Sequence, residues 1–144
     1  MATQDTQNSD LVGIYQTLCD QQDDLSAEIQ KPATTQAQAQ AISTEIQEIA
    51  HRIILVQNLL FTEDSGKLSA LVPVITAAST DLTTAIGQIQ NVNNFLATVS
   101  SFLSDVDDAI DLAKTIAAAA WLTLIKIWRT ILKQDQFEKG CLCQ

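Results

Sequence analysis

The sequence has few of the residues that make turns and few of those that carry most enzyme chemistry. Its 144 residues include only four glycines, two prolines and one histidine. So little turn chemistry predicts a few long secondary-structure elements. The remainder is rich in Ala, Leu and Gln, which favour helices. A hydrophobic share of 47% excludes a disordered chain.

Basic residues are also scarce, and they are unevenly placed. Eight Lys and Arg oppose 17 Asp and Glu, so the net charge is −9. From residue 114 onward five basic residues stand against two acidic ones, giving +3, and residues 1–113 therefore carry −12. An acidic body repels nucleic acid, so we expect no nucleic-acid partner. The cationic end fits an anionic membrane surface or an acidic partner, or it complements the dipole at the C-terminal end of a helix.

The two ends of the chain carry little targeting information. The first ten residues, MATQDTQNSD, lack the basic and apolar regions of a secretory signal, which predicts a cytoplasmic protein or a peripheral membrane protein. The three cysteines, Cys19, Cys141 and Cys143, are an odd number without framework spacing, which fits a reducing compartment or a disulfide-poor protein. The final CLCQ matches the C-a-a-X prenylation pattern, so Cys141 is a candidate lipidation site, and a flexible tail with two exposed thiols is the alternative.

No constellation of residues predicts an enzyme, a metal site or a cofactor. The chain has no glycine-rich phosphate loop, and a single histidine leaves a nucleophile few candidate bases. His51 follows Glu48 at the spacing found in carboxylate-bridged di-iron bundles, but such sites need two copies of the pair. The acidic residues 104–111 lack the turn glycine of a calcium loop. We expect His51 and these aspartates on solvated helix faces, with Glu48 paired to Arg52.

Apolar positions recur with helical rather than strand spacing in four segments. The ends of these segments are marked by candidate N-caps, the Lys31-Pro32 step, the turn at residues 62–67, and the glycine and asparagines at 87–94. Pro73 is best tolerated in a first turn, so the third helix is expected to begin near it. The predicted helices span residues 9–30, 35–62, 72–92 and 95–138.

Short connections between these helices make sequential helices antiparallel neighbours. The predicted fold is therefore all-α: an elongated up-down-up-down bundle of about four helices, forming one domain at residues 9–138. The predicted flexible ends are residues 1–8 and the cysteine-containing tail at 139–144. Two heptad-spaced series without a polar residue, from 75 to 131 and from 71 to 127, predict a long C-terminal helix that projects beyond the other three.

The most apolar long stretch is residues 114–132, which contain both tryptophans. On a helical wheel one continuous half is apolar, and Lys126, Arg129 and Lys133 lie on the other half, with Leu122 the one apolar residue among them. The uncharged run is too short to span a bilayer. The wide apolar face fits either a bundle core, which unbroken heptad phase favours, or an interfacial helix, which tryptophan beside Lys and Arg favours. The candidate membrane or partner interface comprises Trp121, Leu124, Ile125, Lys126, Trp128, Arg129, Ile131, Leu132 and Lys133.

The predicted function is protein association without catalysis. A fourth helix that extends beyond the other three leaves Leu124, Ile127 and Ile131 exposed within one subunit. Exposed apolar patches of this kind usually mark an interface, which predicts a homo-oligomer. The alternative is a membrane-active helical protein, peripheral or pore-forming. The apolar flanks IILVQNLLF and LSALVPVITAA around TEDSGK are similar, at the level of fold, to helical pore-forming toxins with an apolar hairpin tip, and that resemblance implies membrane insertion.

Overall fold

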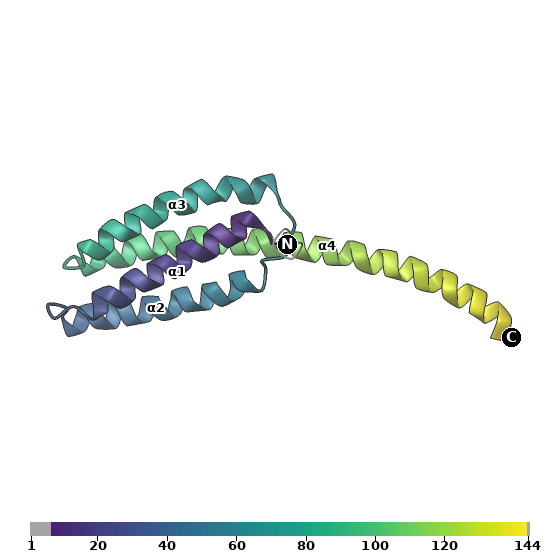
Figure 1. The fold of residues 1–144 in the computed structure, drawn as a ribbon, viewed down its shortest axis with the longest axis horizontal. Helices are drawn as coiled ribbons and strands as arrows, with labels where there is room; N and C mark the ends of the chain where they lie inside the picture. The colour runs from purple at the N-terminus through teal and green to yellow at the C-terminus, as the bar shows by residue number, and fades with distance from the viewer. Residues whose placement is uncertain (1–6, 144) are drawn as a thin grey trace.

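The computed structural model describes residues 7–143, with side chains as far as residue 132. Over these residues the chain forms four helices and no strand (Figure 1), which confirms the all-α bundle with a long C-terminal helix. The helices are α1 (Ser9–Ile29), α2 (Gln36–Gln57), α3 (Gly66–Gly87) and α4 (Val92–Cys143).

Each helix begins at a side chain that accepts hydrogen bonds from its first turn. Asn8 Oδ1 accepts from the backbone of residues 10 and 11 at 3.0 and 3.2 Å. Thr35 forms a reciprocal capping box with Gln38. Ser65 caps α3, and Asn91 Oδ1 accepts from the backbone N–H of residue 94 at 3.1 Å. These caps satisfy donors that an α-helix leaves free, so they fix where each helix starts.

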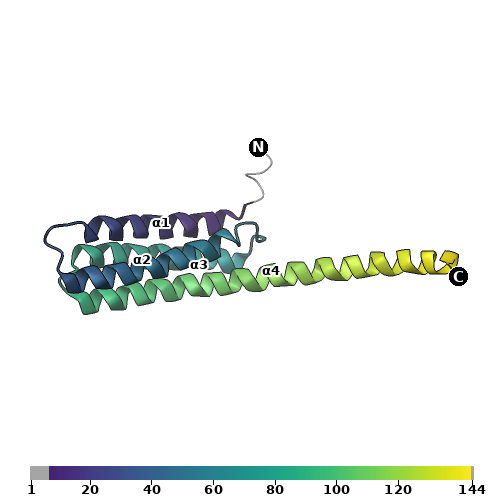
Figure 2. The same ribbon diagram turned by 90° about the horizontal axis from the view of Figure 1, so that it is seen from below.

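The four helices alternate in direction and lie at the corners of a square. α1 contacts α2 and α3, and α4 also contacts α2 and α3. Seen from two sides, α2 and α3 lie diagonally opposite each other, as do α1 and α4 (Figures 1 and 2). The prediction that sequential helices are neighbours is therefore wrong for α2 and α3. Their connection, residues 58–65, is long enough to cross the end of a bundle whose neighbouring axes lie about 8–10 Å apart.

The core runs the length of the square and is built from aliphatic residues of all four helices and two phenylalanines of α4. Its fully buried members include Leu11, Leu18, Leu25, Ile42, Ile49, Val56, Leu68, Ile75, Leu82, Phe95, Phe102 and Val106. One buried amide lies among them: Gln21 of α1 donates from Nε2 to Ser79 O at 3.1 Å and to Thr83 Oγ1 at 3.0 Å on α3. The hydrophobic periodicity thus becomes a single continuous core.

Two sequence-based expectations about α3 and α4 need correction. α3 begins at Gly66, and Pro73 lies inside it, because Pro73 and Ser69 are exposed and the carbonyl that loses its partner faces solvent. In the bundled part of α4 the heptad positions Val99, Leu103, Val106, Ile110 and Ala113 are buried as predicted, but Leu96 is exposed. Its neighbour Phe95 is buried in the core instead.

The ends of the chain differ from the predicted boundaries. Residues 1–6 and 144 lie outside the described residues. Asn8, placed in the predicted flexible N-terminus, is buried at 2% exposure. α4 spans Val92–Cys143, and the predicted tail at residues 139–144 lies outside the residues whose side chains are described.

Candidate interaction surface

The part of α4 that leaves the bundle carries the largest exposed apolar side chains described. Among the residues of α4 whose side chains are described, Ala113 is the last that is fully buried. Beyond it α4 continues alone, away from the other helices (Figure 2). We call the described part of this extension, residues 114–132, the projecting segment. Its exposed large apolar residues are Trp121, Leu122, Leu124, Ile127, Trp128, Ile131 and Leu132.

Burial of this segment in the bundle core, which the heptad phase favoured, is wrong for the single chain. Trp121 is 63% exposed, Trp128 60% and Leu124 50%. The heptad pattern continues because the stripe that faces the core as far as Ala113 extends along the same side of α4. The other three helices end before the stripe does. The expectation that Leu124, Ile127 and Ile131 lie uncovered within one subunit is confirmed.

The predicted interface residues divide by face as the wheel indicates. Ile125 is half-buried, while Lys126 and Arg129 are exposed together with the apolar members. Lys133 and Cys141 lie outside the residues whose side chains are described. Along residues 116–132 an apolar face and a cationic face therefore lie on opposite sides of the helix. The apolar face can be buried against another surface while the cationic face stays in solvent.

The α2–α3 connection crosses the bundle where α4 leaves it, and the start of α1 holds it there. The backbone N–H of Asn8 donates to Leu60 O at 2.6 Å. Its Nδ2 donates to Thr62 O at 3.0 Å and to Glu63 O at 3.1 Å. Asn8 therefore caps α1 and fixes the connection at once, which places Phe61 and Glu63 at the exit of α4.

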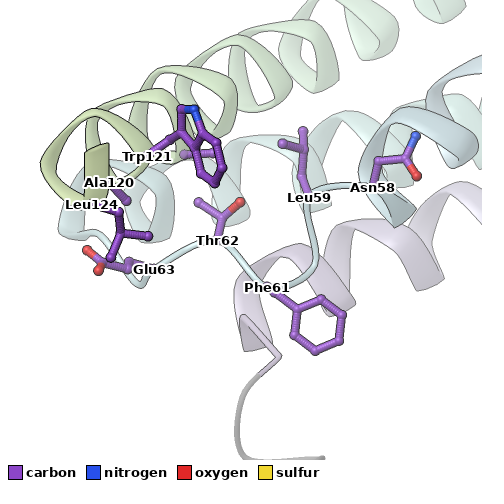
Figure 3. Close-up of a pocket in the computed structure, with 9 residues that line it drawn as sticks. Asn58, Leu59, Phe61, Thr62, Glu63, Ala120, Trp121 and Leu124 are labelled. Atoms are coloured by element: carbon purple, nitrogen blue, oxygen red, sulfur yellow. The ribbon is translucent and has the colours of Figure 1, made fainter. Parts of the chain in front are cut away.

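Two shallow grooves lie between this connection and α4. The first, of about 330 Å³, is lined by Asn58, Leu59, Phe61, Thr62, Glu63, Ala117, Ala120, Trp121 and Leu124. The ring of Trp121 lies over the connection near Thr62, and Phe61, 68% exposed, extends away from α4 (Figure 3). The second, of about 480 Å³, shares Glu63, Ala120 and Leu124 with the first and adds Ile116, Ala119 and Thr123. Glu63 thus lies between two apolar hollows.

An ion-pair network joins α2 to the bundled half of α4. Arg52 donates from Nε and Nη2 to the two carboxylate oxygens of Asp107 at 2.9 and 3.0 Å. It also donates to Glu48 Oε2 at 2.6 Å, as predicted for this i,i+4 pair. The hydrogen bond to Asp107 raises the pKa of the Arg52 guanidinium, Glu48 adds to this effect, and burial opposes it. Burial raises the pKa of Glu45, reinforced by Glu48 and opposed by Arg52.

The residues weighed for metal chemistry are dispersed. His51 is exposed, as predicted. Among the described residues no group of three or more His, Cys, Asp and Glu side chains is placed to hold a metal ion. One described helix, α3, is long and apolar enough by composition to cross a membrane, and 22% of its apolar window is buried in the bundle. Leu68, Ile75 and Leu82 are among its residues buried in the core. A core helix of a soluble bundle has the same composition.

The projecting segment could be identified in the sequence, but the grooves beside it could not. Phe61 and Glu63 were assigned only to a turn and its apolar flank. The missing information was the diagonal crossing of the α2–α3 connection, which brings residues 58–63 to α4. Asn8 was placed in the predicted flexible N-terminus, and nothing in the sequence indicated its bonds to residues about 55 positions away. No protein-family model, curated protein or solved structure matches this chain.

Proposed function

We propose that this protein is a non-enzymatic helical bundle that self-associates through the apolar face of the projecting segment. The observation that carries the proposal is the exposure of Leu124, Ile127 and Ile131 on the same stripe that forms the core as far as Ala113. An apolar stripe shaped by core packing is complementary to another helix. A single chain supplies no further described helix to cover it.

The size of the stripe supports an interface. Residues 116–132 extend about 25 Å at ~1.5 Å per residue, and half the circumference of a helix about 10 Å wide is roughly 16 Å. The apolar face is therefore about 400 Å² in area, within the range of apolar patches that are often functional. Covering such a face on each of two chains removes about 800 Å² from water. At ~25 cal/mol per Å² this gives roughly 20 kcal/mol before the entropic cost of association.

The test is the molar mass of the intact chain and of two charge-insertion variants in solution. Ile127→Glu places a carboxylate on the apolar stripe, and Thr115→Glu places one at an exposed position on the polar half of the same helix. We expect the wild type and Thr115→Glu to be oligomeric at tens of micromolar and Ile127→Glu to be monomeric. If both variants retained the mass of the wild type, the stripe would not be the interface.

The second candidate function is binding to an anionic membrane surface, which one specific observation favours. The exposed Trp121 and Trp128 lie within the apolar face, and the exposed Lys126 and Arg129 lie on the opposite half. Helices with this distribution lie in the membrane interface, where each cation contributes roughly 1 kcal/mol near a negative surface. The same apolar stripe would then face lipid instead of a second chain.

Tryptophan fluorescence with vesicles separates the two candidates. Membrane binding predicts a blue shift of Trp121 and Trp128 on adding anionic vesicles, which weakens with salt because screening shortens to ~3 Å at 1 M. The shift would disappear in Lys126→Glu/Arg129→Glu and persist in Lys31→Glu/Lys67→Glu, which changes the charge equally on the bundle. Self-association predicts that emission is already blue-shifted in buffer and changes little with lipid.

A further inference from the structure

The exposed stripe of α4 lies on the side of the helix that faces the end of its own bundle. Val106 and Ile110 are buried against the other helices, and Ile127 and Leu124 continue their two heptad series on the same side of α4. On this side the α2–α3 connection, residues 58–65, crosses the end of the bundle (Figures 1 and 2). A protein that packs on the stripe close to the bundle therefore also lies against the connection.

Two grooves join the stripe to the connection without a break. Leu124 and Glu63 line both grooves, and Trp121 and Phe61 line the first. The ring of Trp121 lies over Thr62, and the ring of Phe61 follows on the far side of Thr62 (Figure 3). The apolar stripe and residues 58–63 of the connection thus form one continuous surface with two walls, which we call the angled surface.

The stripe alone is smaller than the interface of a typical stable dimer. Its area of about 400 Å² per chain is half of the roughly 800 Å² per partner that a specific interface of standard size buries. Phe61 is 68% exposed, and full burial of an aromatic side chain covers about 150–250 Å², so about 100–170 Å² of Phe61 is available to a partner. The walls of the two grooves add further area. The connection therefore supplies area that the stripe lacks.

The connection is ordered before any partner binds. Asn8 is 2% exposed and donates to three carbonyl oxygens of the connection, once from its backbone and twice from its side chain. Ser69 Oγ donates to Asp10 Oδ2 at 2.6 Å, so the first turn of α1 holds the start of α3 as well. A surface that is fixed in advance loses little conformational entropy on association.

The charge of the projecting segment makes a second copy a suitable occupant. Glu63 and Asp64 are exposed on the connection, while residues 114–132 contain three basic residues and no acidic one. A second copy that brings its own apolar stripe to the angled surface also brings positive charge towards the two carboxylates.

We propose that a second copy covers the α2–α3 connection together with the stripe, with Phe61 as a contact residue and Asn8 as the positioning residue of this interface. Asn8 acts through the connection, because its bonds hold Phe61 and Glu63 beside α4. This inference rests on the proposed self-association and adds the end of the bundle to the surface that binds the second copy.

A photo-cross-linker in place of Phe61 tests the contact directly. The photoreactive residue p-benzoylphenylalanine replaces Phe61 in one chain and, in a control chain, Leu96, an exposed apolar residue at the opposite end of the bundle. Both chains are irradiated at a concentration at which sedimentation shows the oligomer. We expect a covalent dimer from position 61 and none from position 96. Equal yields from the two positions, or no covalent dimer from position 61 in an oligomer, would overturn the inference, whereas a monomeric mass would overturn the proposed function.

Truncation of Phe61 measures how much the connection contributes. Because Phe61 is largely exposed in the single chain, Phe61→Ala should leave the bundle folded and raise the dissociation constant by about tenfold or more. Leu96→Ala, at the opposite end of the bundle, should leave the dissociation constant unchanged. A Phe61→Ala chain that associates as tightly as the wild type would show that the interface does not include the connection.

Asn8→Asp separates the two tasks of Asn8. The variant keeps the oxygen that caps α1 but loses the amide that donates to two carbonyl oxygens of the connection. We expect faster amide hydrogen exchange in residues 58–65 and a higher dissociation constant, with the helix content of the wild type. Faster exchange with an unchanged dissociation constant would show that the second copy does not depend on the position of the connection, and unchanged exchange would show that Asn8 does not hold it.

Discussion

Shortening two side chains of the apolar stripe tests quantitatively whether the stripe drives self-association. The double variant Leu124→Ala/Ile131→Ala removes apolar groups from two positions one heptad apart. The two side chains are 50% and 47% exposed in the single chain, so about half of each is available for burial by a partner. Alanine is the best helix former, so the substitutions do not weaken α4 itself.

The expected loss follows from the exposed fractions. Fully burying a Leu or Ile side chain contributes about 1.5–3 kcal/mol, so covering half of one contributes about 1 kcal/mol. Two positions in each of two chains give about 4 kcal/mol per dimer, which is a roughly 1,000-fold increase in the dissociation constant. A dimer with a nanomolar constant would become micromolar, and a micromolar dimer would be monomeric at all practical concentrations.

The assay is sedimentation equilibrium over a wide range of protein concentration, with Leu122→Ala as the matched control. Leu122 is 57% exposed but lies on the polar half of α4, so its truncation removes exposed apolar area away from the stripe. We expect Leu122→Ala to associate like the wild type, and both variants to have the helix content and thermal stability of an intact bundle. Equal weakening by Leu122→Ala and by the double variant would show that association does not depend on the apolar face of α4.

Three further predictions concern the bundle. Phe102→Ala removes a fully buried ring and should lower the free energy of unfolding by about 3–5 kcal/mol in urea denaturation; a loss below about 1 kcal/mol would show that Phe102 is not a core residue. Arg52→Ala breaks the bidentate bond to Asp107 and should cost about 1–2 kcal/mol, whereas the exposed Arg129→Ala should leave unfolding unchanged; equal effects would contradict the α2–α4 link. The pKa of Glu45 is raised in the folded state, so the folded chain loses stability as pH rises through the window above the ordinary carboxyl pKa. Glu45→Gln should therefore raise the melting temperature at pH 7 and have no effect below about pH 4; a destabilised variant at pH 7 would reverse this assignment.

The helices could be predicted from the sequence because their causes are local. Apolar spacing, N-caps such as Thr35 and the turn residues around Ser65 depend on neighbours within a few positions. The error at Pro73 has a local cause as well, since tolerance of proline inside a helix depends on whether the affected carbonyl faces solvent. The exception at Leu96 is confined to the start of α4, because Val99, Leu103 and Val106 are buried as the heptad spacing predicts.

The arrangement of the helices depended on contacts that no local pattern encodes. A connection of the length of residues 58–65 reaches either a neighbouring or a diagonal corner of the square. Asn8 decides between them in part, by bonding to the backbone of residues 60, 62 and 63. The groove beside Trp121 follows from that crossing, so it could not be predicted before the crossing was known.

The projecting segment shows why a core and an interface are hard to distinguish in a sequence. Ala113 and Leu124 obey the same heptad spacing, yet one is fully buried and the other half exposed. The spacing reports only that a side of the helix is covered by something apolar. What covers it depends on where the other three helices end.

Self-association is tested by the molar mass of the intact chain, measured by sedimentation velocity between about 1 and 100 micromolar at physiological salt. We expect species of two or more times the chain mass of 15.7 kDa, with a population that grows with concentration as two-body association requires. A single species of 15.7 kDa throughout this range, with Trp121 and Trp128 emitting as solvent-exposed indoles, would contradict it.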